Sequence, residues 1–156
     1  MRIALGNDHH GCMLKNAIID FIKVEGHTTL NFGCNTSDPV DYPDFAAQVT
    51  KAIVEGKAER GILICASGIG MSIAANKCRG IRAALCCTLE MATRARLHND
   101  ANVLCVGADF VDIETALQIV RSFINTGFEG GRHQRRLDKI ANLESANRAI
   151  PGDDLS

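Results

Sequence analysis

Cys65 is the residue whose surroundings most clearly suggest chemistry. It ends the apolar run Gly61 to Cys65 and is followed by the glycine-rich segment Ala66-Ser67-Gly68-Ile69-Gly70 and then by a helical pattern from Met71. A thiol between a buried strand and a helix start faces the positive end of the helix dipole, which stabilises its thiolate. The successive N–H groups of Ala66 to Gly70 would also form a small anion-binding concavity. We therefore predict a reactive thiol beside a loop that suits a developing oxyanion.

Other interpretations of this loop fit the sequence less well. Cys65 could simply be the last buried residue of its strand, the role that we expect for Cys86, Cys87 and Cys105. A cysteine-phosphatase loop would place an arginine six residues after the nucleophile, where Met71 stands. A dinucleotide fingerprint would need a third glycine at Ile73, and it belongs after the first strand of a fold. A redox thiol would need a partner, and Cys78 lies about three helical turns away.

A second polar segment, Asp8-His9-His10, follows the first apolar run. Its carboxylate and imidazoles could contact a sugar hydroxyl and a phosphate across a crevice from Cys65. Asp8 could instead cap a helix, with both histidines solvated. The same residues together with His98 could bind a divalent metal ion, although we expect no metal in this protein.

Two more segments carry residues suited to an anionic substrate. His98-Asn99-Asp100 ends a predicted helix, where a histidine is favoured as a cation, so that structural and catalytic roles are both open. Arg132-His133-Gln134-Arg135-Arg136 follows two glycines, and Arg132 and Arg136 would lie one helical turn apart and could grip one phosphate. A solvated helix start is the simpler interpretation, but arginines there oppose the helix dipole, which an anionic ligand would help to explain.

The framework that must position these residues alternates strands and helices. Apolar runs at residues 3–5, 28–32, 61–65, 81–87 and 102–107 are each followed by an amphipathic stretch. We predict a single domain over residues 1–156: a three-layer α/β/α sandwich with a five-stranded parallel, Rossmann-like sheet of order 2-1-3-4-5. In this order successive strands are added first to one side of strand 1 and then to the other, so the direction of winding reverses between strands 1 and 3. A ligand should bind at the carboxyl ends of these two strands. Residues 127–150 form a C-terminal extension with an extra helix, which we expect to pack on a partner subunit.

Composition narrows the classes of function. The formal net charge of -1 offers no basic field for nucleic acid. No apolar run approaches the ~20 residues of a membrane span. The first apolar run is interrupted by a glycine and is too short for a signal peptide. Seven cysteines, an odd number without a CxxC pair, fit a reducing compartment. We expect a cytoplasmic protein that acts on a small molecule.

Taken together, the motifs resemble the B-type ribose-5-phosphate isomerases, a family that also includes allose- and galactose-6-phosphate isomerases. The resemblance covers nearly the whole chain and is carried by Asp8-His9, Cys65 to Gly70, Ser72-Ile73-Ala74-Ala75-Asn76-Lys77, His98 to Asn102 and Glu129 to His133. It implies interconversion of ribose 5-phosphate and ribulose 5-phosphate through a cis-enediolate, in the non-oxidative pentose phosphate pathway, without metal or cofactor. It also implies a homodimer, or a dimer of dimers, in which the active site is shared between subunits.

The resemblance also implies a role for each site residue. Cys65 matches the catalytic base, and Met71 stands where another branch of the family has a glutamate base. His98 matches the ring-opening residue, which Asp8 would orient or assist. Ser67 and the amides of Ala66, Gly68, Ile69 and Gly70 would stabilise the enediolate. Phosphate and substrate contacts are implied for His9, Asn99, Arg132, His133 and Arg136.

One position departs from the family pattern. Asp109 stands where the family usually has an arginine that helps to hold the substrate. An anion near a phosphate weakens binding, so the substrate could be allose or galactose 6-phosphate instead. A non-catalytic sensor of phosphosugars or nucleotides is the alternative from another class.

Overall fold

The computed structural model describes residues 1–146 and contains a five-stranded sheet in which all neighbouring strands pair in parallel. Its strands are β1 (Arg2–Asn7), β2 (Thr28–Asn31), β3 (Arg60–Cys65), β4 (Ala83–Leu85) and β5 (Val103–Gly107). The order is β2-β1-β3-β5-β4. The predicted parallel α/β architecture is therefore confirmed.

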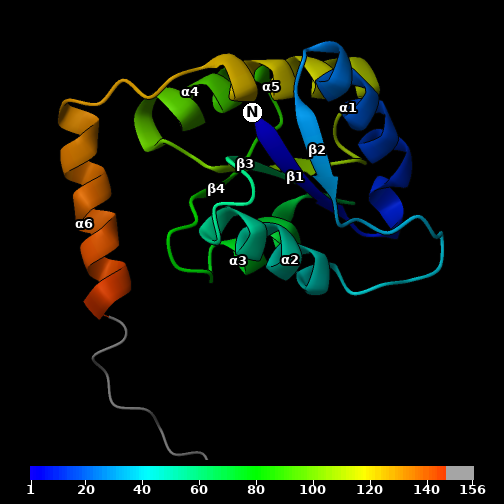
Figure 1. Ribbon diagram of the computed structural model, residues 1–156, viewed down its shortest axis with the longest axis horizontal. Coiled ribbons are helices and arrows are strands. Elements are labelled where there is room, and N and C mark those ends of the chain that lie inside the picture. The colour runs from blue at the N-terminus through cyan, green and yellow to red at the C-terminus, as the bar shows by residue number, and fades with distance from the viewer. Residues whose placement is uncertain (147–156) are drawn as a thin grey trace, which may run out of the picture.

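Helices cover both faces of this sheet and make the predicted three layers (Figure 1). They are a 3-10 turn, η1 (His9–Gly11), followed by α1 (Cys12–Val24), α2 (Tyr42–Val54), α3 (Ile69–Ala75), α4 (Leu89–Asn99), α5 (Ile113–Asn125) and α6 (Arg132–Ala146). One face packs against α1, α4 and α5, and the other against α2 and α3. Within residues 1–146, no helix combines the length and apolarity that a membrane crossing needs.

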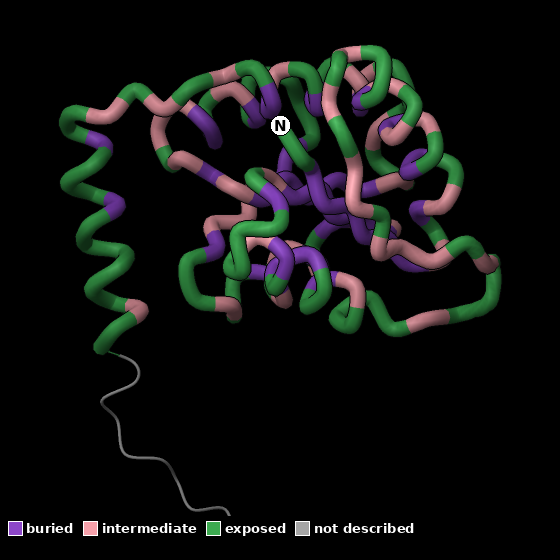
Figure 2. The backbone as a smooth tube through the Cα atoms, in the orientation of Figure 1, coloured by how far each residue is buried: buried purple, intermediate pink, exposed green. Residues whose placement is uncertain are grey.

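The alternation of side chains along each strand builds the two cores. Ile3 and Leu5 of β1 point into the α1, α4 and α5 layer, whereas Ala4 between them points into the α2 and α3 layer. All three are completely buried, as a strand covered on both faces requires. The purple segments of Figure 2 gather at the centre of the molecule, between the two helix layers. Cys65 belongs to the α2 and α3 layer, on the same side of the sheet as Met71.

The strand order differs from the prediction in the last two strands, which run 5-4 instead of 4-5. Every residue of β5 is buried, whereas the three residues of β4 are only partly buried. A fully apolar strand gains most from having neighbours on both edges, and a short strand is well suited to the sheet edge. The exchange leaves the reversal of winding between β1 and β3 unchanged.

The helix α6 stands apart from the body of the molecule (Figure 1). It buries His133 and Leu137 but leaves Ile140 47% and Leu143 66% exposed. Its contacts with the rest of the chain are mainly with α4, and Glu144 accepts a hydrogen bond from the Gly80 N–H at 3.0 Å. Part of the predicted extension, residues 147–150, lies outside the described residues.

Candidate functional site

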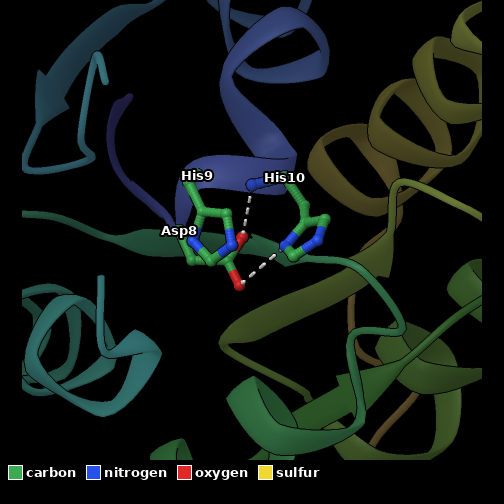
Figure 3. A group of neighbouring side chains, drawn as sticks. All are labelled: Asp8, His9 and His10. Atoms are coloured by element: carbon green, nitrogen blue, oxygen red, sulfur yellow. Dashed lines mark hydrogen bonds and ion pairs between the residues drawn. The ribbon is translucent and has the colours of Figure 1, made fainter. Parts of the chain in front are cut away.

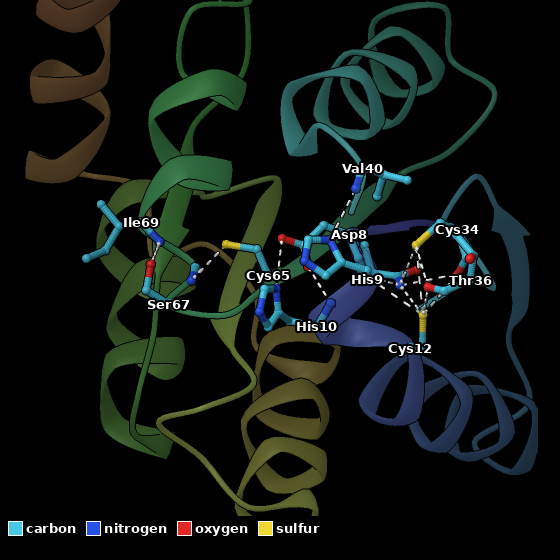
Figure 4. Close-up of polar contacts among 12 residues, drawn as sticks. Asp8, His9, His10, Cys12, Cys34, Thr36, Val40, Cys65, Ser67 and Ile69 are labelled. Carbon is cyan, nitrogen blue, oxygen red and sulfur yellow. Dashed lines mark hydrogen bonds and ion pairs between the residues drawn. The ribbon is translucent and has the colours of Figure 1, made fainter. Parts of the chain in front are cut away.

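Cys65 lies at the carboxyl end of β3, and the loop after it turns back onto its sulfur. The thiol is 5% exposed, and its Sγ accepts a hydrogen bond from the Gly68 N–H at 3.1 Å. Gly68 has φ 75, a left-handed conformation that favours glycine, and it precedes α3. The Ser67 hydroxyl accepts a hydrogen bond from the Ile69 N–H at 3.2 Å (Figure 4). The loop thus directs the Gly68 N–H at the Cys65 thiol and the Ile69 N–H at the Ser67 hydroxyl.

The end of β5 fixes the position of this loop. The N–H groups of Ala108 and Asp109 donate to the carbonyl oxygens of Cys65 and Ala66 at 2.9 and 3.0 Å. The loop passes so close that a Cβ on Gly107 would lie 2.6 Å from the Ser67 carbonyl oxygen. Only glycine at this position allows the approach, so Gly107 sets the geometry around Cys65.

We expect Gly107→Ala to displace the loop and to destabilise the fold by about 1–3 kcal/mol, because the added methyl group meets main-chain atoms that cannot rotate away. Urea denaturation would measure the loss in the free energy of unfolding. Gly127→Ala is the matched control, since a Cβ there would have no atom within 4 Å. Equal stabilities of the two variants would contradict this account of Gly107.

Asp8, His9 and His10 sit beside the Cys65 loop, because the Asp8 N–H donates to the Ile64 carbonyl oxygen at 3.2 Å. The buried Asp8 carboxylate caps η1 by accepting from the His10 N–H at 3.0 Å, and its other oxygen lies 3.7 Å from His10 Nδ1 (Figure 3). His9 Nδ1 accepts from the Val40 N–H at 3.3 Å. The capping role considered for Asp8 is therefore observed, and it leaves Asp8 next to the thiol-bearing strand.

A second group of predicted residues forms around the ends of α4 and α6. The rings of His98 and His133 stack with centroids 4.4 Å apart, and their Nε2 atoms lie 3.8 and 3.7 Å from the Glu129 carboxylate. Burial, then the neighbouring His98, lowers the pKa of His133, which Glu129 partly opposes. Arg132 and Arg136 are exposed one turn apart at the start of α6, as predicted. This group combines two stacked imidazoles beside one carboxylate with two exposed guanidinium groups at the start of α6.

Asp100 holds the end of α4 in place. It adopts φ 43 after the last helical residue, and its carboxylate pairs with Arg96 and Arg82, each at 2.9 Å. Arg96 is only 2% exposed and also donates to the Ala101 carbonyl oxygen at 2.6 Å. The position of His98 is thus set by a buried guanidinium two residues earlier.

The two groups lie at opposite ends of the strands within one chain. The helix α4 follows β4, runs back past the sheet and ends before β5 begins. Asn102, just beyond α4, accepts at its carbonyl oxygen from the Gly61 N–H near the amino end of β3, whereas Cys65 ends that strand. Since a strand rises ~3.3 Å per residue, about 13 Å of β3 separates Gly61 from Cys65. A single chain does not bring His98 to Cys65.

Among residues 1–146, two groups have ligand atoms close enough to share a metal ion: Asp8, His9, His10, and His98, Glu129, His133. In each group these atoms lie within 4.8 Å of one another. The single metal site combining Asp8, His9, His10 and His98, considered as an alternative, is not formed, because His98 lies in the other group.

The remaining cysteines range from buried to exposed. Burial, followed by the neighbouring Cys87, raises the pKa of Cys86 to about 12, and burial also raises the pKa of Cys105. The expectation that Cys87 is buried is wrong, because β4 ends at Leu85 and Cys87 is exposed beyond it. A feature absent from the prediction is the approach of Cys12 and Cys34, whose Sγ atoms lie 3.8 Å apart.

A model of the Ribose/Galactose Isomerase family matches residues 3–140. The chain belongs to this family. Ribose-5-phosphate isomerase B of Escherichia coli is 43% identical over 143 residues, which are 92% of this chain and 96% of that protein. The resemblance to the B-type ribose-5-phosphate isomerases, and with it the class of sugar-phosphate isomerase enzymes, is confirmed.

Solved structures of the family share the fold over more than nine-tenths of this chain. Ribose-5-phosphate isomerase B of Clostridium thermocellum superimposes with a TM-score of 0.93 at 46% identity, covering 94% of this chain and 99% of that one. The enzyme of Mycoplasma genitalium, crystallised with bound ribulose-5-phosphate, gives 0.89 at 41% identity and covers 92% and 96%. The sandwich described here is therefore the architecture of the isomerase family.

Proposed function

We propose that this protein is a cytoplasmic isomerase that interconverts ribose 5-phosphate and ribulose 5-phosphate, with Cys65 as the base. The observation that carries the proposal is the buried Cys65 thiol, whose Sγ accepts from the Gly68 N–H of its own loop at the carboxyl end of the sheet, where the strand order reverses between β1 and β3. Ribulose-5-phosphate bound to the Mycoplasma genitalium relative supports this substrate class. Seven free thiols fit a reducing compartment.

The reaction requires a proton to move between two adjacent carbons of the open-chain sugar. The Cys65 thiolate removes the proton from C2 of the aldose, and the electron pair forms the C1–C2 double bond of a cis-enediolate. The carbonyl electron pair moves onto O1 in this step, and a proton passes from the C2 hydroxyl to O1. The thiol then returns its proton to C1 while the C2–O bond becomes the carbonyl of the ketose, which regenerates the thiolate. The Ser67 hydroxyl and the free main-chain N–H groups of the loop donate to the enediolate oxygens, where negative charge develops.

Ring opening and phosphate binding are assigned to the other predicted residues. His98 moves a proton to the ring oxygen so that the sugar opens, and Asp8 orients or assists this step. Arg132 and Arg136 bind the phosphate from one helical turn, with His133, His9 and Asn99 completing the contacts.

These roles require two subunits, because Cys65 and His98 lie at opposite ends of the strands within one chain. We assign the second group of each site to His98 of the partner subunit and its neighbours in a homodimer. The exposed Ile140 and Leu143 support this arrangement, since apolar side chains on a projecting helix gain stability when covered. A cavity of about 440 Å³ between α6 and the β4 edge leaves room for the partner's side chains.

Asp109 decides which sugar phosphate is preferred. It lines a cavity of about 630 Å³ beside His10, together with Glu114. Because a carboxylate repels phosphate, we expect Asp109→Arg to lower the KM for ribose 5-phosphate about tenfold, which corresponds to ~1.4 kcal/mol. Glu114→Arg makes the same charge change on the same cavity and should alter KM less. Equal effects would mean that net charge, and not position 109, is responsible.

A panel of ribose 5-phosphate, allose 6-phosphate and galactose 6-phosphate tests the substrate assignment directly. Ketose formation should be fastest with ribose 5-phosphate, and it should survive exhaustive dialysis against a chelator because no step of the mechanism uses a metal. Turnover of none of the three would favour the phosphosugar sensor. Activity lost to the chelator and restored by a metal would refute the metal-free mechanism.

A further inference from the structure

Two cysteines outside the catalytic loop face each other across a turn. Cys12 is the first residue of α1, and Cys34 follows β2. They are 22 residues apart in sequence, yet their Sγ atoms lie 3.8 Å apart (Figure 4). Both are partly exposed free thiols, so a dissolved oxidant can reach them. Bonded sulfurs lie ~2.05 Å apart, and a shift of about 2 Å would therefore join them.

Asn7, at the end of β1, holds the two thiols together. Its side-chain Nδ2 donates to Cys12 Sγ at 3.5 Å and to Cys34 Sγ at 3.7 Å, and its carbonyl oxygen accepts from the Cys34 N–H at 3.3 Å. The turn closes tightly, because a Cβ on Gly33 would lie 1.8 Å from Asn7 Oδ1. The approach of the two sulfurs is thus a consequence of fixed backbone contacts.

The charges around the pair favour one direction of reaction. Burial, followed by the hydrogen bond with Cys12, raises the pKa of Cys34, and the positive charge of Lys15 only partly offsets this. Lys15 is fully buried and donates from Nζ to the Cys34 carbonyl oxygen at 2.7 Å. Because a raised pKa disfavours the Cys34 thiolate, the first attack is assigned to Cys12 and the second to Cys34.

We propose that Cys12 and Cys34 form an oxidisable dithiol that closes to an intramolecular disulfide when it meets a peroxide. The Cys12 thiolate attacks a peroxide oxygen, breaks the O–O bond and becomes a sulfenic acid, releasing hydroxide that is protonated to water. Cys34 then attacks the Cys12 sulfur, and the sulfenic oxygen leaves as a second water. Two thiols lose two electrons and two protons, and hydrogen peroxide gains both to give two waters.

The disulfide would act on the neighbouring candidate site through one loop. The segment after Cys34 leads to Val40, whose N–H donates to His9 Nδ1 at 3.3 Å. Drawing Cys34 towards Cys12 shifts this segment and weakens that hydrogen bond, which orients the His9 ring. On the proposed function, in which His9 contacts the phosphate, oxidation should raise the KM for ribose 5-phosphate severalfold and leave kcat nearly unchanged.

The test is to treat the full-length protein with hydrogen peroxide and to measure its intact mass, its disulfide-linked peptides and its KM. We expect a loss of about 2 Da from the two removed hydrogens, a cross-linked peptide pair joining Cys12 and Cys34, and reversal by dithiothreitol. Cys12→Ser and Cys34→Ser should each abolish the cross-link. Cys87→Ser, at an exposed thiol without this partner, should leave it intact.

Each outcome decides one claim. Separate oxygen adducts on Cys12 and Cys34, or unmodified thiols at both while Cys87 oxidises, would overturn the dithiol. The mass result in the wild type needs neither a folded variant nor turnover, so it stands apart from the isomerase assignment. A rise in KM that persists in peroxide-treated Cys12→Ser would trace the effect to another thiol and overturn the coupling to His9.

Discussion

Cys65→Ala should lower the rate of ketose formation from ribose 5-phosphate by about a thousandfold, the usual contribution of a positioned general base. Alanine removes the sulfur but keeps the Cβ, so the loop retains its hydrogen bonds from Ala108 and Asp109. The effect should fall on kcat, because the thiolate acts on the C2 proton and not on the phosphate. Initial rates over a range of substrate concentrations would separate kcat from KM.

Two controls make this result specific to the thiol of Cys65. Cys87→Ala removes an exposed thiol outside the site and should leave the rate unchanged. A thermal melt of Cys65→Ala checks that the loss of one buried sulfur has not unfolded the protein, since such truncations cost only a few kcal/mol. If folded Cys65→Ala forms ketose as fast as the wild type, Cys65 is not the base.

The fold could be predicted from sequence because its signals are local. Apolar runs of strand length separated by amphipathic stretches specify a parallel sheet covered on both faces, and the loop after Cys65 indicates where its ligand site should lie. The order of the last two strands could not be obtained this way, because both runs are apolar. Their difference lies in burial, complete for β5 and partial for β4, which only the packed structure reveals.

The sequence singles out the segments of the candidate site, but it does not predict how they are arranged. Asp8 follows β1 and Cys65 ends the neighbouring β3, and the hydrogen bond from the Asp8 N–H to the Ile64 carbonyl oxygen brings the two segments together. His98 lies near the end of a helix that runs back across the sheet, so it lies at the opposite end of the strands from Cys65, a separation that no single motif reveals. The pairing of Cys12 with Cys34 left no sequence signal, because it depends on how closely the turn at Gly33 approaches Asn7.

Cys65 and His98 lie at opposite ends of the strands within one chain. Two variants that are each inactive, one at either residue, should therefore restore activity to each other in a mixed dimer. We propose to co-express Cys65→Ala and His98→Ala with different affinity tags and to isolate the heterodimer. In a symmetric dimer with shared sites, one site then carries both changes and the other carries neither. The heterodimer should therefore have about half of the wild-type activity, although each parent homodimer has almost none.

The matched control combines Cys65→Ala with Asp8→Asn, two changes at the same carboxyl end of the sheet. Each site of that heterodimer lacks either the thiol or the carboxylate, so activity should stay as low as in the parent variants. Recovery in the first pair and not in the second would assign Cys65 and His98 to different subunits of one site. If neither heterodimer recovers activity, His98 does not act across the interface. The ring-opening step must then use a group at the same end of the strands as Cys65, where His10 Nδ1 lies 3.7 Å from the Asp8 carboxylate.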